Sequence, residues 1–250
     1  MDHSRLSFRP HRFVRTDAAL HAEADLGSRL LVFGLLAALA PASLAAEGSA
    51  HGTVRLFTVN EAGQRVPKPD ASSVVVYLIG FNQPAPADVP RISQKNKTFI
   101  PDSLPIVVGQ TVEFTNDDNI IHNVFSTSKA RTFDLGKPRA GESRRVKFDQ
   151  TGLVDVYCDI HEQMIATILV LPNRAFTLTG ADGSFSLKGV PPGHYSLFAW
   201  SRAANPARAE VDILPGQDTG ATLELTETKF NLTHLGKYGQ PYRKQPDYPP

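Results

Sequence analysis

The chain has 250 residues, and its 26 lysines and arginines nearly balance its 25 aspartates and glutamates, which gives a formal net charge of +1. This balance argues against nucleic acid or an anionic membrane as the main partner, because both favour a basic surplus. The single cysteine excludes a disulfide within the chain, and the length suffices for one large domain or two small ones.

The first 45 residues are typical of a secretory signal peptide. A basic leader ends at Arg29, an apolar run follows over residues 30–39, and Ser43-Leu44-Ala45 resembles an A-x-A cleavage site. A run of about ten apolar residues is too short to span a membrane, which needs roughly 20. We therefore expect cleavage after Ala45 or Ala46, a periplasmic or secreted protein, and no membrane span. Removal of the signal would leave 21 basic and 21 acidic residues.

The remaining chain predicts an all-β fold. No segment keeps a helical period, whereas short alternating or wholly apolar runs recur between Gly, Pro, Asn and Asp residues. Residues 165–171 are apolar on both faces, as a central strand of a β-sandwich would be. The expected strands are residues 53–59, 73–79, 106–108, 111–115, 144–148, 154–158, 165–171, 184–187, 195–200, 209–214 and 222–225.

Two changes of composition divide this run of strands. The stretch "NQPAPADVP", residues 82–90, contains three prolines and predicts a linker, and "LPN" at residues 171–173 closes the next block. The segment between them, residues 90–172, holds the cysteine. Residues 227–250 show no periodicity and predict a flexible tail or, alternatively, a segment that docks a partner.

The stretch "YCDIHEQM", residues 157–164, contains the only cysteine, Cys158, with His161 three places on and Met164 three places after that. A second imidazole, His122, lies in "NDDNIIHNVFS". Two imidazoles, a thiolate and a thioether are the ligand set of an electron-transfer copper site, in which a His2Cys plane is completed by a weak axial Met. Structural zinc normally uses several cysteines, and this chain has one.

The expected strands place these residues in two segments. Cys158 ends one strand and the next begins at residue 165, so His161 and Met164 lie in the loop between them. His122 ends a different strand, and the fold must bring it to the loop. Three nearby acids are interpreted as ordinary turn and capping residues, with a hard-cation site as the alternative: Asp117, Asp118 and Asp159.

With these residues the chain resembles a cupredoxin, the type 1 blue copper family that includes plastocyanin and pseudoazurin. The phrases that carry the resemblance are "NKTFIPDSLPIVVGQTVEFTNDDNIIHNVFS" and "VDVYCDIHEQMIATILVLP". The resemblance implies a Greek-key β-sandwich over residues 90–172 with one type 1 copper per chain. It also implies His122, Cys158 and His161 as equatorial ligands and Met164 as the axial ligand. Asn123 matches the family residue that ties the first ligand segment to the cysteine loop and helps to hydrogen-bond the sulfur.

The loop departs from the plastocyanin pattern, which places four residues between the second histidine and the methionine. Here only Glu162 and Gln163 separate His161 from Met164. In its arrangement the chain resembles secreted cupredoxins associated with methylamine utilisation. A shorter loop is expected to alter the distance or angle of the thioether, and a Glu162 or Gln163 oxygen is the alternative axial donor. Met164 is the only methionine after residue 45.

The flanks carry a second resemblance, in "HGTVRLFTVNEAGQRVPKPDASSVVVYLIG" and "TGADGSFSLKGVPPGHYSLFAW". Both look like parts of a carboxypeptidase regulatory-like or Cna-B-type Ig-like sandwich, with a turn at Asp182-Gly183. We expect the cupredoxin to be inserted into one discontinuous Ig-like domain, residues 51–82 and 173–226. The alternative is two consecutive units. Three histidines without partners at ligand spacing are interpreted as surface or turn residues: His51, His194 and His234.

The first resemblance implies a protein that carries single electrons between protein redox partners, with the imidazole edge of His161 as the electron exit. One alternative is a periplasmic copper carrier or chaperone, which would release Cu(I) quickly to a chelator. Another is an Ig-like glycan- or protein-binding module with a structural metal, although Trp200 is the only tryptophan and lies within an expected strand. An enzyme is not expected, because a single His2Cys set offers no open position for substrate.

Overall fold

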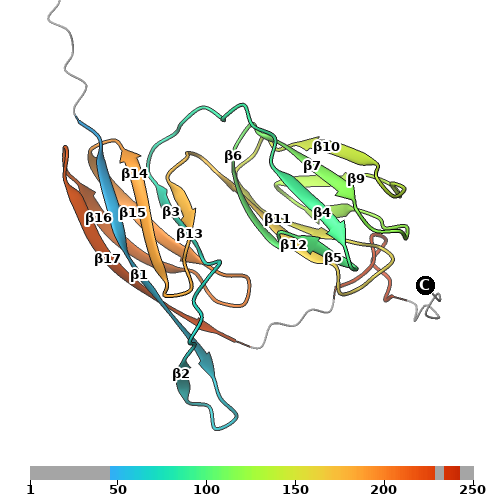
Figure 1. Ribbon diagram of the computed structural model, residues 1–250, viewed down its shortest axis with the longest axis horizontal. Coiled ribbons are helices and arrows are strands. Elements are labelled where there is room, and N and C mark those ends of the chain that lie inside the picture. The colour runs from blue at the N-terminus through green and yellow to red at the C-terminus, as the bar shows by residue number, and fades with distance from the viewer. Residues whose placement is uncertain (1–45, 229–233, 243–250) are drawn as a thin grey trace, which may run out of the picture. The chain divides into compact units, whose positions relative to one another are not determined.

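The computed structural model describes residues 46–228 and 234–242 (Figure 1). Every helix or strand assigned in these residues is a β-strand, which confirms the all-β class. In this part of the chain no helix is long and apolar enough to cross a membrane. The expected signal peptide, residues 1–45, lies outside the described residues.

Two sheets built from residues 91–171 form what we call the central sandwich (Figure 1). One sheet has the order β10 (Ser143–Lys147), β7 (Thr111–Asn116), β4 (Arg91–Lys95) and β5 (Thr98–Ile100). The other has the order β6 (Ser103–Val107), β12 (Ile165–Leu171), β11 (Gly152–Tyr157), β8 (Phe125–Ser128) and β9 (Arg131–Asp134). Inward side chains of both sheets, such as Phe114 and Ile168, share one apolar core cluster.

Two further sheets form the flanking sandwich, with its own core cluster. One has the order β14 (Ser184–Val190), β1 (Gly48–Val59) and β17 (Asp218–Glu227), with β2 (Arg65–Pro67) paired to β1. The other has the order β13 (Phe176–Leu178), β3 (Val75–Ile79), β15 (Gly193–Trp200) and β16 (Ala207–Ile213). In β1 the apolar Val54 and Leu56 are buried while Thr53 and Arg55 are exposed, as the alternation of a half-buried strand requires.

All eleven expected strands overlap observed strands, and β12 matches at both ends. Its seven residues are all buried, because it lies between β6 and β11 inside the sheet. Six strands were not expected: β2, β4, β5, β8, β9 and β13. They are three to five residues long, and polar sequences such as "RISQK" in β4 lack the apolar alternation that predicts a strand.

Part of the range expected to form a flexible tail, residues 227–250, makes contacts within the described structure. Glu227 is the last residue of β17, and the Thr228 amide donates a hydrogen bond to the Ala203 carbonyl. Residues 234–242 lie against the loop that joins β11 to β12, where side chains and backbone amides of this segment form hydrogen bonds. The low hydrophobicity of the segment hid these contacts, because they are polar and aromatic.

Replacement of Gly183 by alanine is expected to destabilise the flanking sandwich. Gly183 has a φ of +78°, and an added Cβ would lie 2.1 Å from the Val54 carbonyl oxygen. Gly63 is the matched control, because its φ is +77° and an added Cβ would meet nothing within 4 Å. We expect Gly63→Ala to lower the free energy of unfolding by about 1 kcal/mol, the cost of left-handed backbone. Gly183→Ala should lower it by roughly 3 kcal/mol or more, because the backbone must also shift.

Urea unfolding followed by the fluorescence of Trp200 measures both variants. Equal losses of stability in the two alanine variants would contradict the steric part of this account.

Candidate metal centre

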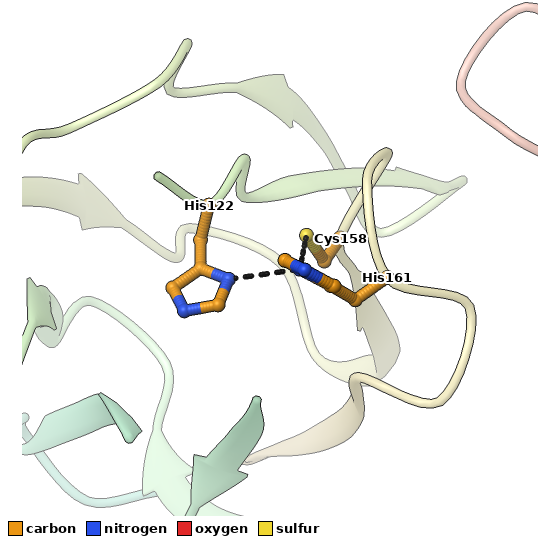
Figure 2. Close-up of side chains that lie close together, drawn as sticks. All are labelled: His122, Cys158 and His161. Atoms are coloured by element: carbon orange, nitrogen blue, oxygen red, sulfur yellow. Dashed lines mark hydrogen bonds between the residues drawn. The ribbon is translucent and has the colours of Figure 1, made fainter. Parts of the chain in front are cut away.

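Three side chains from two segments meet at one end of the central sandwich (Figure 2). Cys158 follows β11 and His161 lies in the loop before β12, which we call the ligand loop, residues 158–164. His122 comes from the segment between β7 and β8. The Nδ1 atoms of His122 and His161 are 3.1 Å apart, and Cys158 Sγ is 3.8 Å from His161 Nδ1. The fold therefore brings His122 close to Cys158 and His161, which the spacing in the sequence had already placed in one loop.

The donor set fits a metal ion that prefers nitrogen and sulfur. The ligand atoms of His122, Cys158 and His161 all lie within 4.8 Å of one another. His122 and Cys158 have no exposed surface, and His161 is half-buried. Two imidazoles and a thiolate suit copper, whereas a hard cation such as Mg²⁺ or Ca²⁺ would require oxygen ligands.

His122 is oriented by a carboxylate. Its Nε2 atom lies 2.7 Å from Asp118 Oδ2, and we assign this contact as an Nε2–H donor to an ionised carboxylate. That tautomer leaves the lone pair of His122 on Nδ1, the atom that faces His161 and Cys158. A hydrogen bond from the second ring nitrogen to a carboxylate also raises the basicity of a ligating imidazole.

Asp118 is itself fixed by the hairpin between β4 and β5. The backbone amides of Asn96 and Lys97 donate to its two carboxylate oxygens at 2.7 and 2.9 Å. Both hairpin residues have a φ of 54°, which turns these amides toward the carboxylate. Burial acts to raise the pKa of Asp118, but the amides of Lys97 and Asn96 and the His122 ring outweigh it, so the pKa is lowered. The residue stays ionised.

The interpretation of Asp118 as an ordinary turn residue was therefore incomplete. The carboxylate does hold turn amides, but it also holds His122. The signal in the sequence was the spacing of four residues between Asp118 and His122 in one loop. Asp117 has a different partner, since it pairs with Arg91 and Ser93.

The sulfur of Cys158 is surrounded by backbone donors. The Asn123 amide lies 3.5 Å and the Ile160 amide 3.4 Å from Sγ. Burial raises the pKa of the Cys158 thiol, and the amides of Asn123, Ile160 and His161 oppose that rise only in part. Burial also lowers the pKa of His161, which favours the neutral imidazole that a metal requires. Metal binding would release the thiol proton.

Asn123 links the two ligand segments through its backbone rather than its side chain. Its amide donates to Cys158 Sγ, whereas its side-chain Nδ2 donates to Asp134 Oδ1 at 2.8 Å and to the Gly136 carbonyl at 2.7 Å. The side chain thus fixes the His122 segment to residues 134–136. The resemblance to cupredoxins implied that Asn123 helps to hydrogen-bond the cysteine sulfur, and in the structure the donor is the backbone amide of Asn123.

Met164 is the last residue of the ligand loop and packs into the apolar core. It is fully buried in the same apolar cluster as Cys158. Its amide donates to the His161 carbonyl at 3.0 Å, and its carbonyl accepts from the Cys158 amide at 3.3 Å. Glu162 and Gln163 are exposed, which disfavours them as donors to a buried site. The axial role of Met164 stays a prediction.

Comparison with known proteins assigns the central sandwich to a family. Residues 89–171 match the copper binding proteins of the plastocyanin/azurin family, so this segment is a copper-binding domain of that type. Comparison with curated proteins found no match. The family match does not extend to the strands of the flanking sandwich, and the expected Ig-like module stays a prediction.

Several solved structures resemble the chain. A purple cupredoxin from Nitrosopumilus maritimus is 24% identical, and the match covers 33% of this chain and 99% of that one, with a TM-score of 0.30. A Cu(I) mutant of amicyanin is 17% identical over 38% of this chain and 98% of that one, with a TM-score of 0.32. A copper-containing nitrite reductase from Thermus scotoductus is 26% identical over 38% of this chain and 25% of that one, with a TM-score of 0.33.

Asp118→Asn is expected to weaken copper binding about 10- to 100-fold, the usual effect of losing a partner of a ligating histidine. The carboxylate accepts from Asn96, Lys97 and His122 with two oxygens, whereas an amide has one oxygen to offer. Asp117→Asn is the matched control, because it removes a neighbouring charge without touching His122. Competition with a chelator of known copper affinity measures both. Equal affinities for the two variants would contradict the positioning role.

Proposed function

We propose that this protein is a type 1 copper protein that carries single electrons between protein redox partners. The observation that carries the proposal is the convergence of His122, Cys158 and His161 in one buried site within a plastocyanin/azurin-type domain. Bound copper supplies one-electron redox chemistry, and the protein sets its potential through the ligands and their surroundings.

The residues of this chain limit movement around the site. Asp118 fixes the ring of His122, the amides of Asn123 and Ile160 point at the sulfur, and the Met164 amide closes the ligand loop. A site whose donors are held by the surrounding fold needs little rearrangement when its charge changes. Such rigidity favours fast electron transfer.

The three residues differ in their access to solvent, and this difference supports an electron exit at His161. His122 and Cys158 are fully buried, while His161 lies half-buried on the ligand loop. A redox partner that docks over this loop would approach the His161 ring before it approached either of the others. The partner face is therefore the surface around the ligand loop.

We further propose that the protein works in the periplasm or is secreted. The proposal is supported by the order of a basic leader, an apolar run and a small-residue site within residues 1–45. The lone Cys158 fits an oxidising compartment as a buried metal ligand, because it has no exposed surface for unwanted oxidation.

The domain organisation that we propose is a copper domain, residues 90–172, inserted into a discontinuous Ig-like module of residues 51–82 and 173–226. Support comes from the pairing of β1 with β17, which lie on opposite sides of the copper domain in the chain and pair in parallel over ten residue pairs. Separate apolar core clusters in the two sandwiches also support it.

Repeated reduction and oxidation in the presence of a Cu(I) chelator distinguishes an electron carrier, which keeps its copper, from a copper carrier, which releases it. We expect one electron per copper in each cycle and retention of the metal, because His122 and Cys158 are buried and held by neighbours. Visible absorption and copper analysis after each cycle measure both quantities. Capture of the copper by the chelator within the first reduction would instead favour a carrier or chaperone.

A further inference from the structure

The segment 234–242, "HLGKYGQPY", has a defined conformation in spite of its polar sequence. The Gly236 amide donates to the Gln240 carbonyl at 2.9 Å, and the Gly239 amide donates to the Gly236 carbonyl at 2.8 Å. These bonds form a compact turn that brings His234 and Tyr242 together, with Tyr242 Oη 3.3 Å from His234 Nδ1.

This turn is bonded to the ligand loop at three places. Tyr242 Oη donates to the Cys158 carbonyl at 2.6 Å, and the Lys237 amide donates to Asp159 Oδ1 at 2.9 Å. His234 Nε2 lies 2.8 Å from the Glu162 carbonyl and donates to it. None of these bonds uses a metal-ligand atom, so the contacts are compatible with a bound ion.

Aromatic side chains also pack the turn against the end of β11. The His234 ring stacks on Tyr157, the last residue of β11, with ring centroids 4.1 Å apart. Tyr242 packs edge-on against His234 at 5.1 Å.

The same turn also reaches the His122 segment. Lys237 Nζ lies 2.8 Å from Asp134 Oδ2, and the other oxygen of Asp134 accepts from the Asn123 side chain at 2.8 Å. The Asn123 amide in turn donates to Cys158 Sγ. A continuous set of polar contacts therefore runs from the turn to both ligand segments.

We propose that residues 234–242 form a strap that positions the ligand loop, with His234, Lys237 and Tyr242 as its positioning residues. Few contacts hold the loop from within: the Met164 amide donates to the His161 carbonyl, and Cys158 contacts Ile160, His161 and Met164. A loop with so few internal bonds opens easily unless outside contacts hold it. The strap supplies those contacts, and this role does not depend on what the copper does.

Cys158 offers a direct probe of loop opening, since it is the only cysteine and is fully buried. The experiment measures the rate at which iodoacetamide alkylates Cys158 in the metal-free full chain, relative to the same chain in denaturant. We expect Tyr242→Phe to raise this rate about two- to tenfold, the effect of losing one hydrogen bond that holds the loop. His234→Ala should raise it at least as much, because ring stacking on Tyr157 is lost as well.

Two matched variants separate positioning from general loss of structure. Tyr238→Phe removes a hydroxyl from the same turn, at a residue that is 77% exposed, and should leave the rate unchanged. His234→Gln keeps a side-chain donor for the Glu162 carbonyl and should restore part of the protection lost in His234→Ala. Urea unfolding followed at Trp200 should give the same midpoint for all variants.

A second measurement follows the copper itself. The strap variants should lose Cu(I) to a chelator faster than Tyr238→Phe does, in proportion to their alkylation rates. Alkylation rates equal to that of Tyr238→Phe in both Tyr242→Phe and His234→Ala would overturn the proposal. That result would leave the electron-carrier proposal intact, because no redox step is involved.

Discussion

The hydrogen bond between Asp118 and His122 is the contact on which the geometry of the site depends most. His122 is the one ligand candidate that comes from outside the ligand loop, and its ring must present Nδ1 to Cys158 and His161. The carboxylate sets that orientation, and the amides of the β4–β5 hairpin hold the carboxylate. An edge hairpin of the sheet therefore fixes a candidate metal ligand on another segment.

The charges of the side chains at the site also limit what it can bind. Burial favours the neutral forms of both Cys158 and His161, whereas Asp118 keeps its negative charge close by. A cation would complement this group of residues, since it would replace the thiol proton and lie near a thiolate and a partly buried carboxylate that is bonded to His122. The backbone amides near Sγ would reduce the charge density on the sulfur, and hydrogen bonding to the sulfur is one of the properties that set the reduction potential of a bound copper.

The sequence predicted those features that depend on local pattern. The apolar run of β12 and the alternation in β7 identify their strands, and the spacing of Cys158, His161 and Met164 places three candidate ligands in one loop. The sequence could not show Asp118 holding His122, because that role needs the hairpin amides of residues 96 and 97. It also missed the strap, whose contacts join residues far apart in the chain and use polar and aromatic groups rather than an apolar period.

Visible absorption during addition of one equivalent of Cu(II) to the mature protein, repeated with Cys158→Ser, tests the central claim most directly. The account predicts an intense thiolate-to-copper band that reaches its full height at one copper per chain and is absent in the variant. The colour of the band would report how the short loop places Met164. Copper binding with the same weak spectrum in both proteins would show that Cys158 is not a ligand and would contradict the type 1 site.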